Sequence, residues 1–355
     1  MPKDNENLPL SILTPDGPAA SSEPKAFAPD QLIDCEKCLR KNPPTRAKCL
    51  YCGAVLTLSD DALDLQRPTL GPLEKWEQGY NNILLPSAAN APQDLSEADE
   101  AEAVNLLKLA PTDLARILSS GGPLPVARTG SIDEAHLIQR RLRSFGLETR
   151  VVSDAELNGE IAPVRVRAVD IDDESLWSYQ TPESTAIQIA WSDFVLFVPG
   201  RLLTKRLTVT EQKASRTENR ILDSSEFFND ETVLDFYTRK DATTYRINAN
   251  SFDFSCLGTK KKLLVAENMS TLVELFRSRA PQAEWDDSYH TIRKVLDAVW
   301  PAEQHNESSG WRRDRPGKHV IGSTTEVSNE SQFLKYSRLR YHFLRMSPPE
   351  TNEDA

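Results

Sequence analysis

The run Leu124-Pro-Val-Ala-Arg-Thr-Gly-Ser-Ile-Asp-Glu-Ala-His-Leu-Ile-Gln-Arg-Arg-Leu-Arg-Ser-Phe-Gly-Leu-Glu-Thr-Arg-Val-Val152 decides the fold of the central part of this chain. Residues 124–128 predict a short strand, and Ser131 with Glu134 forms the capping box typical of a helix N-terminus. The helix carries an apolar stripe that stops at Gly146: Ala135, Ile138, Leu142 and Phe145. Residues 147–152 resume as a strand. The sequence therefore predicts a β-α-β unit, right-handed if both strands share a sheet.

One or two short helices are expected directly before this unit. The apolar residues there recur at helical spacing, are interrupted by Pro111 and end at Gly121 and Gly122: Leu106, Leu107, Ala110, Leu114, Ile117 and Leu118. We assign residues 104–158 to one module. Its β-α-β pattern resembles small bacterial ferredoxin-like regulatory modules, a resemblance that implies no catalytic residue.

Beyond residue 160 the apolar period changes to two, which is typical of strands. Short β-branched or aromatic runs alternate with turn residues, at 164–169, 186–190, 194–198, 207–210, 232–237, 244–247 and 262–265. They predict an antiparallel β domain over 160–301. Two amphipathic helices are expected to close it. Thr271 with Glu274 caps the first, which ends at Pro281, and the second begins at Asp287 or Ser288 and ends at Pro301.

Three stretches lack the patterning of core elements. We interpret residues 1–30 as a disordered leader, 55–103 as an acidic linker that contains prolines, and 302–355 as a polar and basic tail whose end, 347–355, is disordered. Within the linker, Trp76, Tyr80 and residues 83–85 recur with helical spacing. This spacing predicts a helical apolar patch that docks on a neighbouring domain.

Four of the five cysteines fall within eighteen positions: Cys35, Cys38, Cys49 and Cys52. They form two Cys-x-x-Cys pairs with ten residues between them. Each pair predicts a tight knuckle that directs two sulfurs at one point, and two knuckles complete a tetrahedral tetrathiolate suited to Zn²⁺. Because four protein ligands close the coordination shell, no metal-bound water is left for hydrolysis. The predicted zinc ion is therefore structural.

The residues around the cysteines agree with this interpretation. Between 31 and 53 the bases exceed the acids by three, which favours thiolates: Lys37, Arg40, Lys41, Arg46 and Lys48 against Asp34 and Glu36. The turn at 42–44 is expected to bring the second knuckle back to the first. Gly53 lies where the chain must leave close to the metal.

At these residues the sequence resembles two groups of small zinc modules. The Asn-Pro turn between the pairs is similar to a short bacterial zinc ribbon, and the spacing and Asn42 are similar to the Ran-binding-protein type of zinc finger, over residues 33–53 only. Two positions depart from that family: Ile33 stands where it has tryptophan, and Leu39-Arg40 replaces the Thr-Phe pair of its ubiquitin-binding members. The RNA stacking and the ubiquitin contact that the resemblance would imply therefore lose support.

Alternatives to a zinc site are disulfides or thiol redox chemistry, which conflict with the reducing compartment expected for an acidic chain without a signal peptide. A rubredoxin-like iron site would need more residues between the pairs. The basic face of the module either balances the thiolate charge or contacts nucleic acid, and we favour the first interpretation.

Other candidate groups have a structural interpretation beside a functional one. Cys256, near the lysines at 260–262, is either an activated thiol or a core cysteine, and we favour the core. The five histidines lack metal-ligand spacing. Basic clusters at 311–319 and 335–345 either bind phosphates and stack bases, or form an edge strand or helix with buried aromatic residues. We favour the second interpretation.

The predicted fold class is α+β: a small zinc ribbon (31–54), a β-α-β (ferredoxin-like) module, and an antiparallel β domain closed by C-terminal helices. The net charge is -11 and no apolar run is long enough to span a membrane. We therefore expect a soluble cytoplasmic protein that disfavours non-specific binding to nucleic acid.

No nucleotide-binding, zinc-protease or hydrolase motif occurs in the sequence, so nothing in it argues for an enzyme. We predict a non-catalytic interaction or regulatory protein with one structural Zn²⁺ and a protein partner. Two alternatives stay open: a nucleic-acid-associated protein that uses the zinc ribbon and the basic tail, and an enzyme with an unrecognised site in the β-rich domain.

Overall fold

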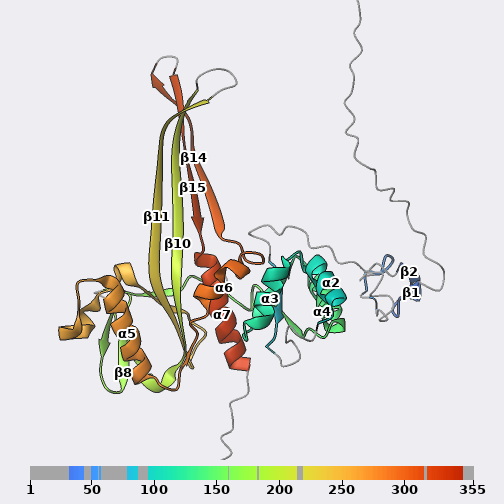
Figure 1. Ribbon diagram of the computed structural model, residues 1–355, viewed down its shortest axis with the longest axis horizontal. Helices are drawn as coiled ribbons and strands as arrows, with labels where there is room; N and C mark the ends of the chain where they lie inside the picture. Colours follow the sequence, from blue (N-terminus) through green and yellow to red (C-terminus); the bar gives the residue numbers. More distant parts are fainter. Residues whose placement is uncertain are drawn as a thin grey trace, which may run out of the picture. The chain divides into compact units, whose positions relative to one another are not determined.

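The computed structural model describes residues 32–43, 49–54, 56, 78–86, 95–158, 160–181, 184–213, 219–315 and 318–346 (Figure 1). The expected leader at 1–30, most of the expected linker and the end at 347–355 lie outside these ranges. The chain divides into two compact units, Met1–Arg67 and Pro68–Ala355. The fold is mixed α+β, and the small sheet near the cysteines belongs to the first unit. No helix within the described ranges is both long and apolar enough to cross a membrane.

The predicted β-α-β unit is confirmed. It consists of β4 (Leu124–Thr129), α4 (Ile132–Ser144) and β5 (Thr149–Ser153). The Ser131 hydroxyl accepts a hydrogen bond from the Glu134 backbone N–H at 3.2 Å, as expected for a capping box. Gly146 follows the helix with φ of +80°, the left-handed conformation that glycine adopts readily.

A third strand, β3 (Tyr80–Leu84), lies between β4 and β5 and runs antiparallel to both. The sequence prediction of a helical linker patch is therefore wrong at these residues, and Trp76 lies outside the described ranges. Two adjacent asparagines concealed the strand, because asparagine is rare in strands. Both are fully buried, and Asn81 accepts a hydrogen bond from the Trp300 indole at 2.8 Å. This strand belongs to the core.

Leu142 supports the first testable prediction. Its side chain is fully buried on α4, within the core cluster that includes Ile83 and Val126. We expect Leu142→Ala to lower the free energy of unfolding by about 2–5 kcal/mol, because the truncation leaves a cavity. His136→Ala, at an exposed position of the same helix, is the control and should change it by less than about 0.5 kcal/mol. Chemical denaturation of both variants would show a reversed order if the buried face of α4 were misassigned.

Two helices precede β4, as predicted: α2 (Glu97–Leu107) and α3 (Pro111–Ser119). The helix α2 begins seven residues before the predicted module because Ser96 caps it, accepting a hydrogen bond from the Asp99 N–H at 3.1 Å. Acidic residues at 97, 99 and 100 favour this first turn through the helix dipole. The acidic run that the sequence analysis placed in a linker thus begins a helix.

The β-rich part contains two sheets. One joins β7 (Ala168–Ile171), β8 (Ser175–Tyr179) and β9 (Ile187–Ala190). The other has the order β14-β15-β10-β11-β12-β6, with β13 (Glu284–Trp285) added beside β10. In this second sheet β6 (Val164–Val166) and β12 (Tyr245–Asn248) are short, and they pair in parallel. The strand β8 was not predicted.

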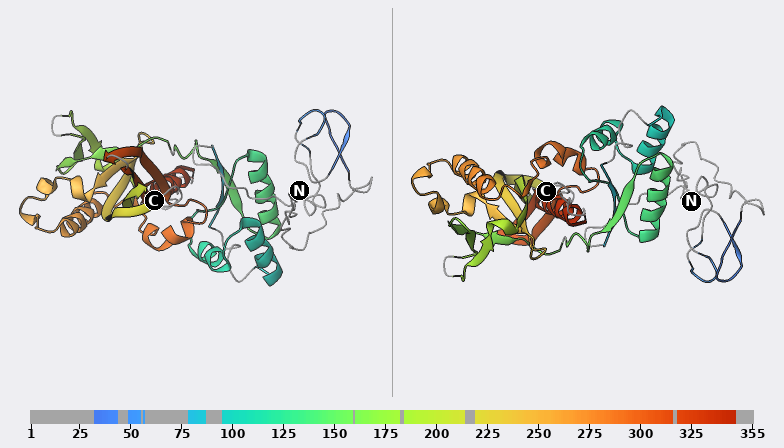
Figure 2. Two further views of the ribbon diagram at one scale, coloured as in Figure 1. Left: turned by 90° about the horizontal axis from the view of Figure 1, so that it is seen from above. Right: turned by 90° about the horizontal axis from the view of Figure 1, so that it is seen from below.

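Four long strands extend from the body as an arm (Figure 1). They are β10 (Phe194–Lys213), β11 (Asn219–Thr238), β14 (Glu303–Arg315) and β15 (Lys318–Ser328). The sequence predicted short separate strands at 194–198 and 207–210, which are parts of β10. We define the arm as residues 201–213, 219–231, 303–315 and 318–328. Figure 2 looks along this arm from above and from below.

The helix α5 (Val265–Arg279) corrects two predictions. Residues 262–265 form the approach to this helix rather than a strand, because the Asn268 side chain accepts from the Lys262 N–H at 2.7 Å and donates to its carbonyl at 2.9 Å. Thr271 does not cap the helix; it lies inside it and donates its hydroxyl hydrogen to the Glu267 carbonyl at 2.9 Å. The apolar side chains at 263–265 are exposed, so they do not belong to the core although their composition is typical of a strand.

The expected polar tail at 302–346 is structured. It contributes β14 and β15 to the sheet and ends in α7 (Glu330–Met346), which packs near α6 (Tyr289–Leu296). Phe333 and Leu339 of α7 are fully buried. The Phe333 ring lies directly over Gly200 of β10, where a Cβ would come within 2.2 Å of the ring. The sequence leaves open whether residues 335–345 form an edge strand or a helix.

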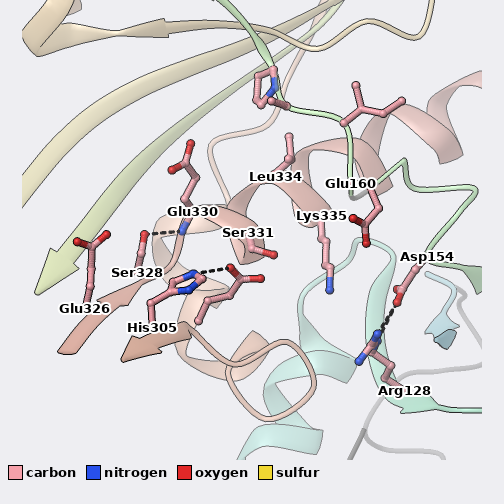
Figure 3. Close-up of a pocket in the computed structure, with 14 residues that line it drawn as sticks. Arg128, Asp154, Glu160, His305, Glu326, Ser328, Glu330, Ser331, Leu334 and Lys335 are labelled. Carbon is pink, nitrogen blue, oxygen red and sulfur yellow. Dashed lines mark hydrogen bonds and ion pairs between the residues drawn. The ribbon is translucent and has the colours of Figure 1, made fainter. Parts of the chain in front are cut away.

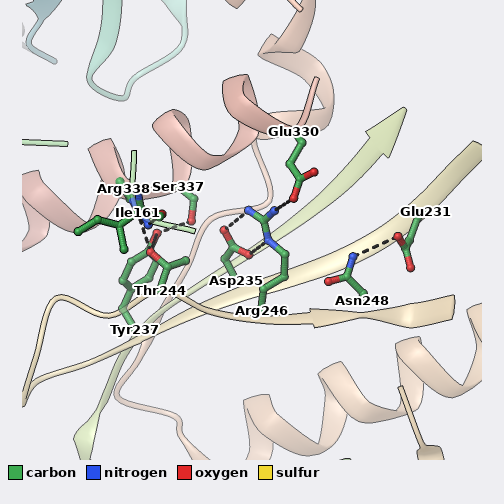
Figure 4. A network of polar contacts seen from close by, with 10 residues as sticks. All are labelled: Ile161, Glu231, Asp235, Tyr237, Thr244, Arg246, Asn248, Glu330, Ser337 and Arg338. Carbon is green, nitrogen blue, oxygen red and sulfur yellow. Dashed lines mark hydrogen bonds and ion pairs between the residues drawn. The ribbon is translucent and has the colours of Figure 1, made fainter. Parts of the chain in front are cut away.

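A buried ion pair joins the neighbouring strands β11 and β12 of the larger sheet (Figure 4). Arg246 of β12 donates to both carboxylate oxygens of Asp235 on β11, at 2.6 and 2.9 Å, and to Glu330 of α7 at 3.0 Å. The Asp235 and Arg246 side chains are 0% and 1% exposed. Beside them, the Tyr237 hydroxyl and Ser337 are 2.7 Å apart. The C-terminal helix is thereby tied to the sheet by charge as well as by apolar contact.

Candidate metal centre

The first cysteine pair lies on a short hairpin. The strands β1 (Ile33–Asp34) and β2 (Lys41–Asn42) pair antiparallel, with Cys35 directly after the first. The Cys35 N–H donates to the Arg40 carbonyl at 3.0 Å, and the Leu39 N–H donates to the Cys35 carbonyl at 2.7 Å. Leu39 has φ of +57°, a conformation that turns the chain sharply after the second cysteine. The knuckle therefore holds Cys35 and Cys38 on the same side of the turn.

The second pair, Cys49 and Cys52, forms a similar knuckle that is not part of a hairpin of strands. The Gly53 N–H donates to the Cys49 carbonyl at 3.0 Å, and the Cys49 N–H donates to the Ala54 carbonyl at 2.8 Å. Gly53 has φ of +70°, which confirms the predicted need for glycine at the exit of the knuckle. The Tyr51 N–H also points at the Cys49 sulfur, 3.4 Å away.

Asn42 connects the two knuckles. Its side chain is fully buried, its amide donates to the Arg40 carbonyl at 2.8 Å, and its Oδ1 accepts from the Leu50 N–H at 2.8 Å. Asn42, the asparagine shared with the zinc-finger family in the resemblance, therefore fixes the second knuckle against the first. Leu56, 2% exposed, packs with Cys35 and Cys49 beneath them.

The four sulfurs converge. The Sγ atoms of Cys35, Cys38, Cys49 and Cys52 all lie within 4.8 Å of one another. Two edges of this cluster measure 3.6 Å, between Cys35 and Cys52, and 3.5 Å, between Cys38 and Cys49. A tetrahedral site with metal–sulfur bonds of about 2.3 Å has edges of about 3.8 Å. All four cysteines are free thiols rather than disulfides. The cluster thus fits a single four-coordinate metal ion.

The pKa values of two thiols diverge. Desolvation raises the pKa of Cys49, but hydrogen bonds from the backbone N–H groups of Tyr51 and Cys52 lower it to about 6. The pKa of Cys38 is raised to about 12, because desolvation and the neighbouring sulfurs outweigh the lowering effect of the Arg40 N–H. Zn²⁺ binds cysteine as the thiolate, so metal binding to this cluster would release protons.

The module presents apolar side chains that sequence reasoning did not single out. Leu39, Leu50 and Tyr51 are 80%, 50% and 57% exposed. They occupy the knuckles themselves, so the metal centre positions them. Arg40 lies over the Tyr51 ring at 4.7 Å, a cation–π contact between the two knuckles. The signal available in the sequence was the placement of large apolar residues beside the cysteines.

Cys256 lies at a different place in the fold. It is part of a 3₁₀ segment, Phe254–Lys260, and packs partly buried against the core. Burial raises the pKa of this thiol to about 11. A thiol with this pKa is protonated at neutral pH, which supports the core interpretation over an activated nucleophile.

The basic residues of the second cluster, at 335–345, make contacts within the fold. The Arg338 guanidinium donates to the Thr244 hydroxyl at 3.0 Å, and Arg340 contacts Glu284 at 2.9 Å. Tyr336 and Tyr341 are buried. The favoured sequence interpretation was an edge strand or helix with buried aromatic residues, and the structure shows the helix. The first cluster differs, since Trp311 on β14 is exposed.

A polar pocket of about 640 Å³ lies where β14, β15 and α7 approach the β-α-β module (Figure 3). Arg128 and Asp154 form an ion pair on one side, and His305 and Glu303 lie 3.7 Å apart on the other. Lys335 points between them, and burial lowers the pKa of its ammonium group. Glu160 and Glu330 add two more carboxylates to the wall.

Comparisons of the chain with protein-family models, with curated proteins and with solved structures find no match. The four-cysteine cluster therefore carries no family assignment, and its chemistry has to be argued from its own geometry.

Proposed function

We propose that this protein is a non-catalytic interaction protein whose N-terminal module is folded by one structural Zn²⁺. The observation that carries the proposal is the convergence of four sulfurs within 4.8 Å on two knuckles that expose Leu39, Leu50 and Tyr51. Four thiolates suit Zn²⁺ and leave no open coordination position for substrate or water. The metal would thus hold a surface in shape rather than perform a reaction.

A protein partner suits this surface better than nucleic acid does. Exposed leucines and a tyrosine on a small rigid module are typical of the apolar centre of a protein interface. No aromatic residue stands at position 33 to stack on a base, and the tail arginines Arg338 and Arg340 are engaged within the chain. Free thiolates require a reducing environment, so we place the protein in the cytoplasm.

The test compares two exposed positions in one knuckle. Leu39→Asp should abolish the capture of specific proteins from the native host. Lys37→Asp is the control, because it introduces the same acidic residue beside the cysteines without removing an apolar side chain, and capture should persist. Removal of zinc with a chelator should abolish the same set. If Leu39→Asp and the zinc-free chain captured the same proteins as the zinc-loaded wild type, the proposal would be contradicted, since neither sample presents the folded apolar surface.

For nucleic acid we expect negligible binding near physiological salt. Binding by the basic residues would release counterions, and the affinity would fall steeply between about 50 and 200 mM salt. Fluorescence anisotropy with single-stranded RNA and duplex DNA measures this. Submicromolar, salt-sensitive affinity that is lost on charge reversal at Arg40 and Lys41 would favour the nucleic-acid alternative.

The pocket around Lys335 favours a second candidate function, the binding of a small polar molecule. A half-buried ammonium that points into the pocket suits a carboxylate, and Glu160 and Glu303 in the same wall suit a cationic group. A thermal-shift panel of amino acids and dicarboxylates would test it. Stabilisation that disappears in Lys335→Met would support a ligand, and an unchanged melting temperature across the panel would remove this candidate.

A further inference from the structure

The two faces of the arm differ in chemistry. Residues that are direct partners across antiparallel strands share a face. The registers place Lys205 beside Phe228 and Val327, and Glu211 beside Ile221 and Ile321. Trp311 of β14 joins the second of these rows through Ile321. We call the face that carries these residues the apolar face of the arm.

Most large side chains on the apolar face are uncovered. Ile221, Phe228 and Trp311 are 61%, 60% and 46% exposed, and Leu207, midway between the two rows, is 38% exposed. The opposite face carries the Arg206–Glu326 ion pair at 2.5 Å, threonines and the exposed ring of Phe227. Uncovered large apolar side chains are therefore more numerous on the apolar face, and a sheet usually packs such a face against another surface.

The order of residues along the apolar face makes it self-complementary. A two-fold axis across the strands at the level of Thr208 brings each row of one arm over the other row of a second arm. Phe228 then lies over Ile221, Val327 over Ile321, and Leu207 over Val209. Two rows lie between the apolar clusters. One holds Leu207 with Glu226, Thr325 and Asn306, and the other holds Val209 with the small side chains of Ser224, Ser323 and Ser308, so the two-fold axis brings the larger side chains of the first row over the small ones of the second.

The charges obey the same symmetry. Lys205 and Glu211 lie at equal distances from Thr208 on the apolar face, so the two-fold axis places each Lys205 near Glu211 of the second copy, in addition to its ion pair with Glu226 of its own chain at 2.5 Å. In addition, the arm contains nine basic and nine acidic residues, although the whole chain carries a net charge of -11. The arm therefore adds no net repulsion when two acidic chains approach.

From these observations we propose that the apolar face of the arm binds a second copy of this chain, forming a two-fold dimer in which two four-stranded sheets pack face to face. The contact is isologous, and the sheets lie about 10 Å apart with their strands within about 30° of antiparallel. This inference does not depend on the zinc module or on its proposed partner.

Sedimentation velocity of the full-length, zinc-loaded chain over a range of concentrations tests the proposal. The mass should rise with concentration from one chain of 39.8 kDa towards two. Phe228→Glu should raise the dissociation constant by at least about tenfold, because it places a charge in the centre of an apolar contact. Phe227→Glu is the matched control. Phe227 is the adjacent residue, is 62% exposed and lies on the opposite face, so the dimer should persist.

A charge swap provides the sharper test. Lys205→Glu and Glu211→Lys should each weaken the dimer, and the double variant should restore it. Within one chain these residues are six positions apart on one strand, about 20 Å, so they cannot pair with each other there. Restoration therefore reports a contact between copies.

Three results would overturn the proposal. They are a mass of one chain at every concentration, an equal effect of Phe227→Glu and Phe228→Glu, or a double charge variant no tighter than the single ones. Circular dichroism of each variant checks that the arm is still folded. Since Lys205, Phe227 and Phe228 are exposed and Glu211 is only partly buried, loss of the fold is not expected.

Discussion

Asp235→Ala is expected to lower the free energy of unfolding of the second unit by about 3–5 kcal/mol. The substitution leaves the Arg246 guanidinium buried without its carboxylate, and an uncompensated buried charge is among the largest single penalties in protein stability. The remaining contact, to Glu330, involves a carboxylate that is 47% exposed and cannot replace a bidentate partner. Denaturant-induced unfolding followed by tryptophan fluorescence measures the change.

Two further variants separate the pair from its surroundings. Glu330→Ala should cost less than about 1 kcal/mol, because this partner lies near the surface. Replacing both buried partners, as in Asp235→Leu with Arg246→Met, should recover most of the loss because no charge is then left buried. A double variant as unstable as Asp235→Ala would show that packing, rather than the unpaired charge, determines the cost.

The second large effect concerns the metal. The purified chain should hold about one Zn²⁺, and Cys38→Ser should lose it and unfold the first unit, because a small zinc module derives its folding free energy from the metal. The main thermal transition should stay almost unchanged. The cysteine cluster has its own small core around Leu56, separate from the two clusters of the second unit.

Elemental analysis and differential scanning calorimetry provide the two readouts. Cys256→Ser is the control, since this thiol belongs to the core of the second unit and should leave the zinc content at one. Iron or no metal in the wild-type chain would refute the zinc assignment. A main transition that falls by many degrees in Cys38→Ser would refute the independence of the two units.

The sequence predicted elements whose pattern is local. The helix α4 combines a capping box, a regular apolar stripe and a terminal glycine within sixteen residues, and all three signals agree. The four cysteines likewise define their cluster by spacing alone. In both cases short-range geometry is sufficient, so no knowledge of distant residues is needed.

Elements stabilised by distant partners were missed. In β3, Asn81 is buried only because Trp300 and Asp154 satisfy its amide, and neither lies near it in the sequence. In α7, Arg338 is buried because Thr244 accepts its hydrogen bond. The full length of β10 and β11 was not predicted either, because strands exposed to solvent need not show an alternation of apolar and polar residues. Tertiary partners decided each of these cases.

The position of α7 in the chain has a consequence for biosynthesis. Phe333 and Tyr336 belong to the same core cluster as Ile83, which is translated about 250 residues earlier. At about 5–20 residues per second, the ribosome needs roughly 12–50 s to cover that interval. During this time the nascent β10 lacks the Phe333 ring that covers Gly200. The core cluster that contains Ile83 is therefore completed only after α7 has been synthesised.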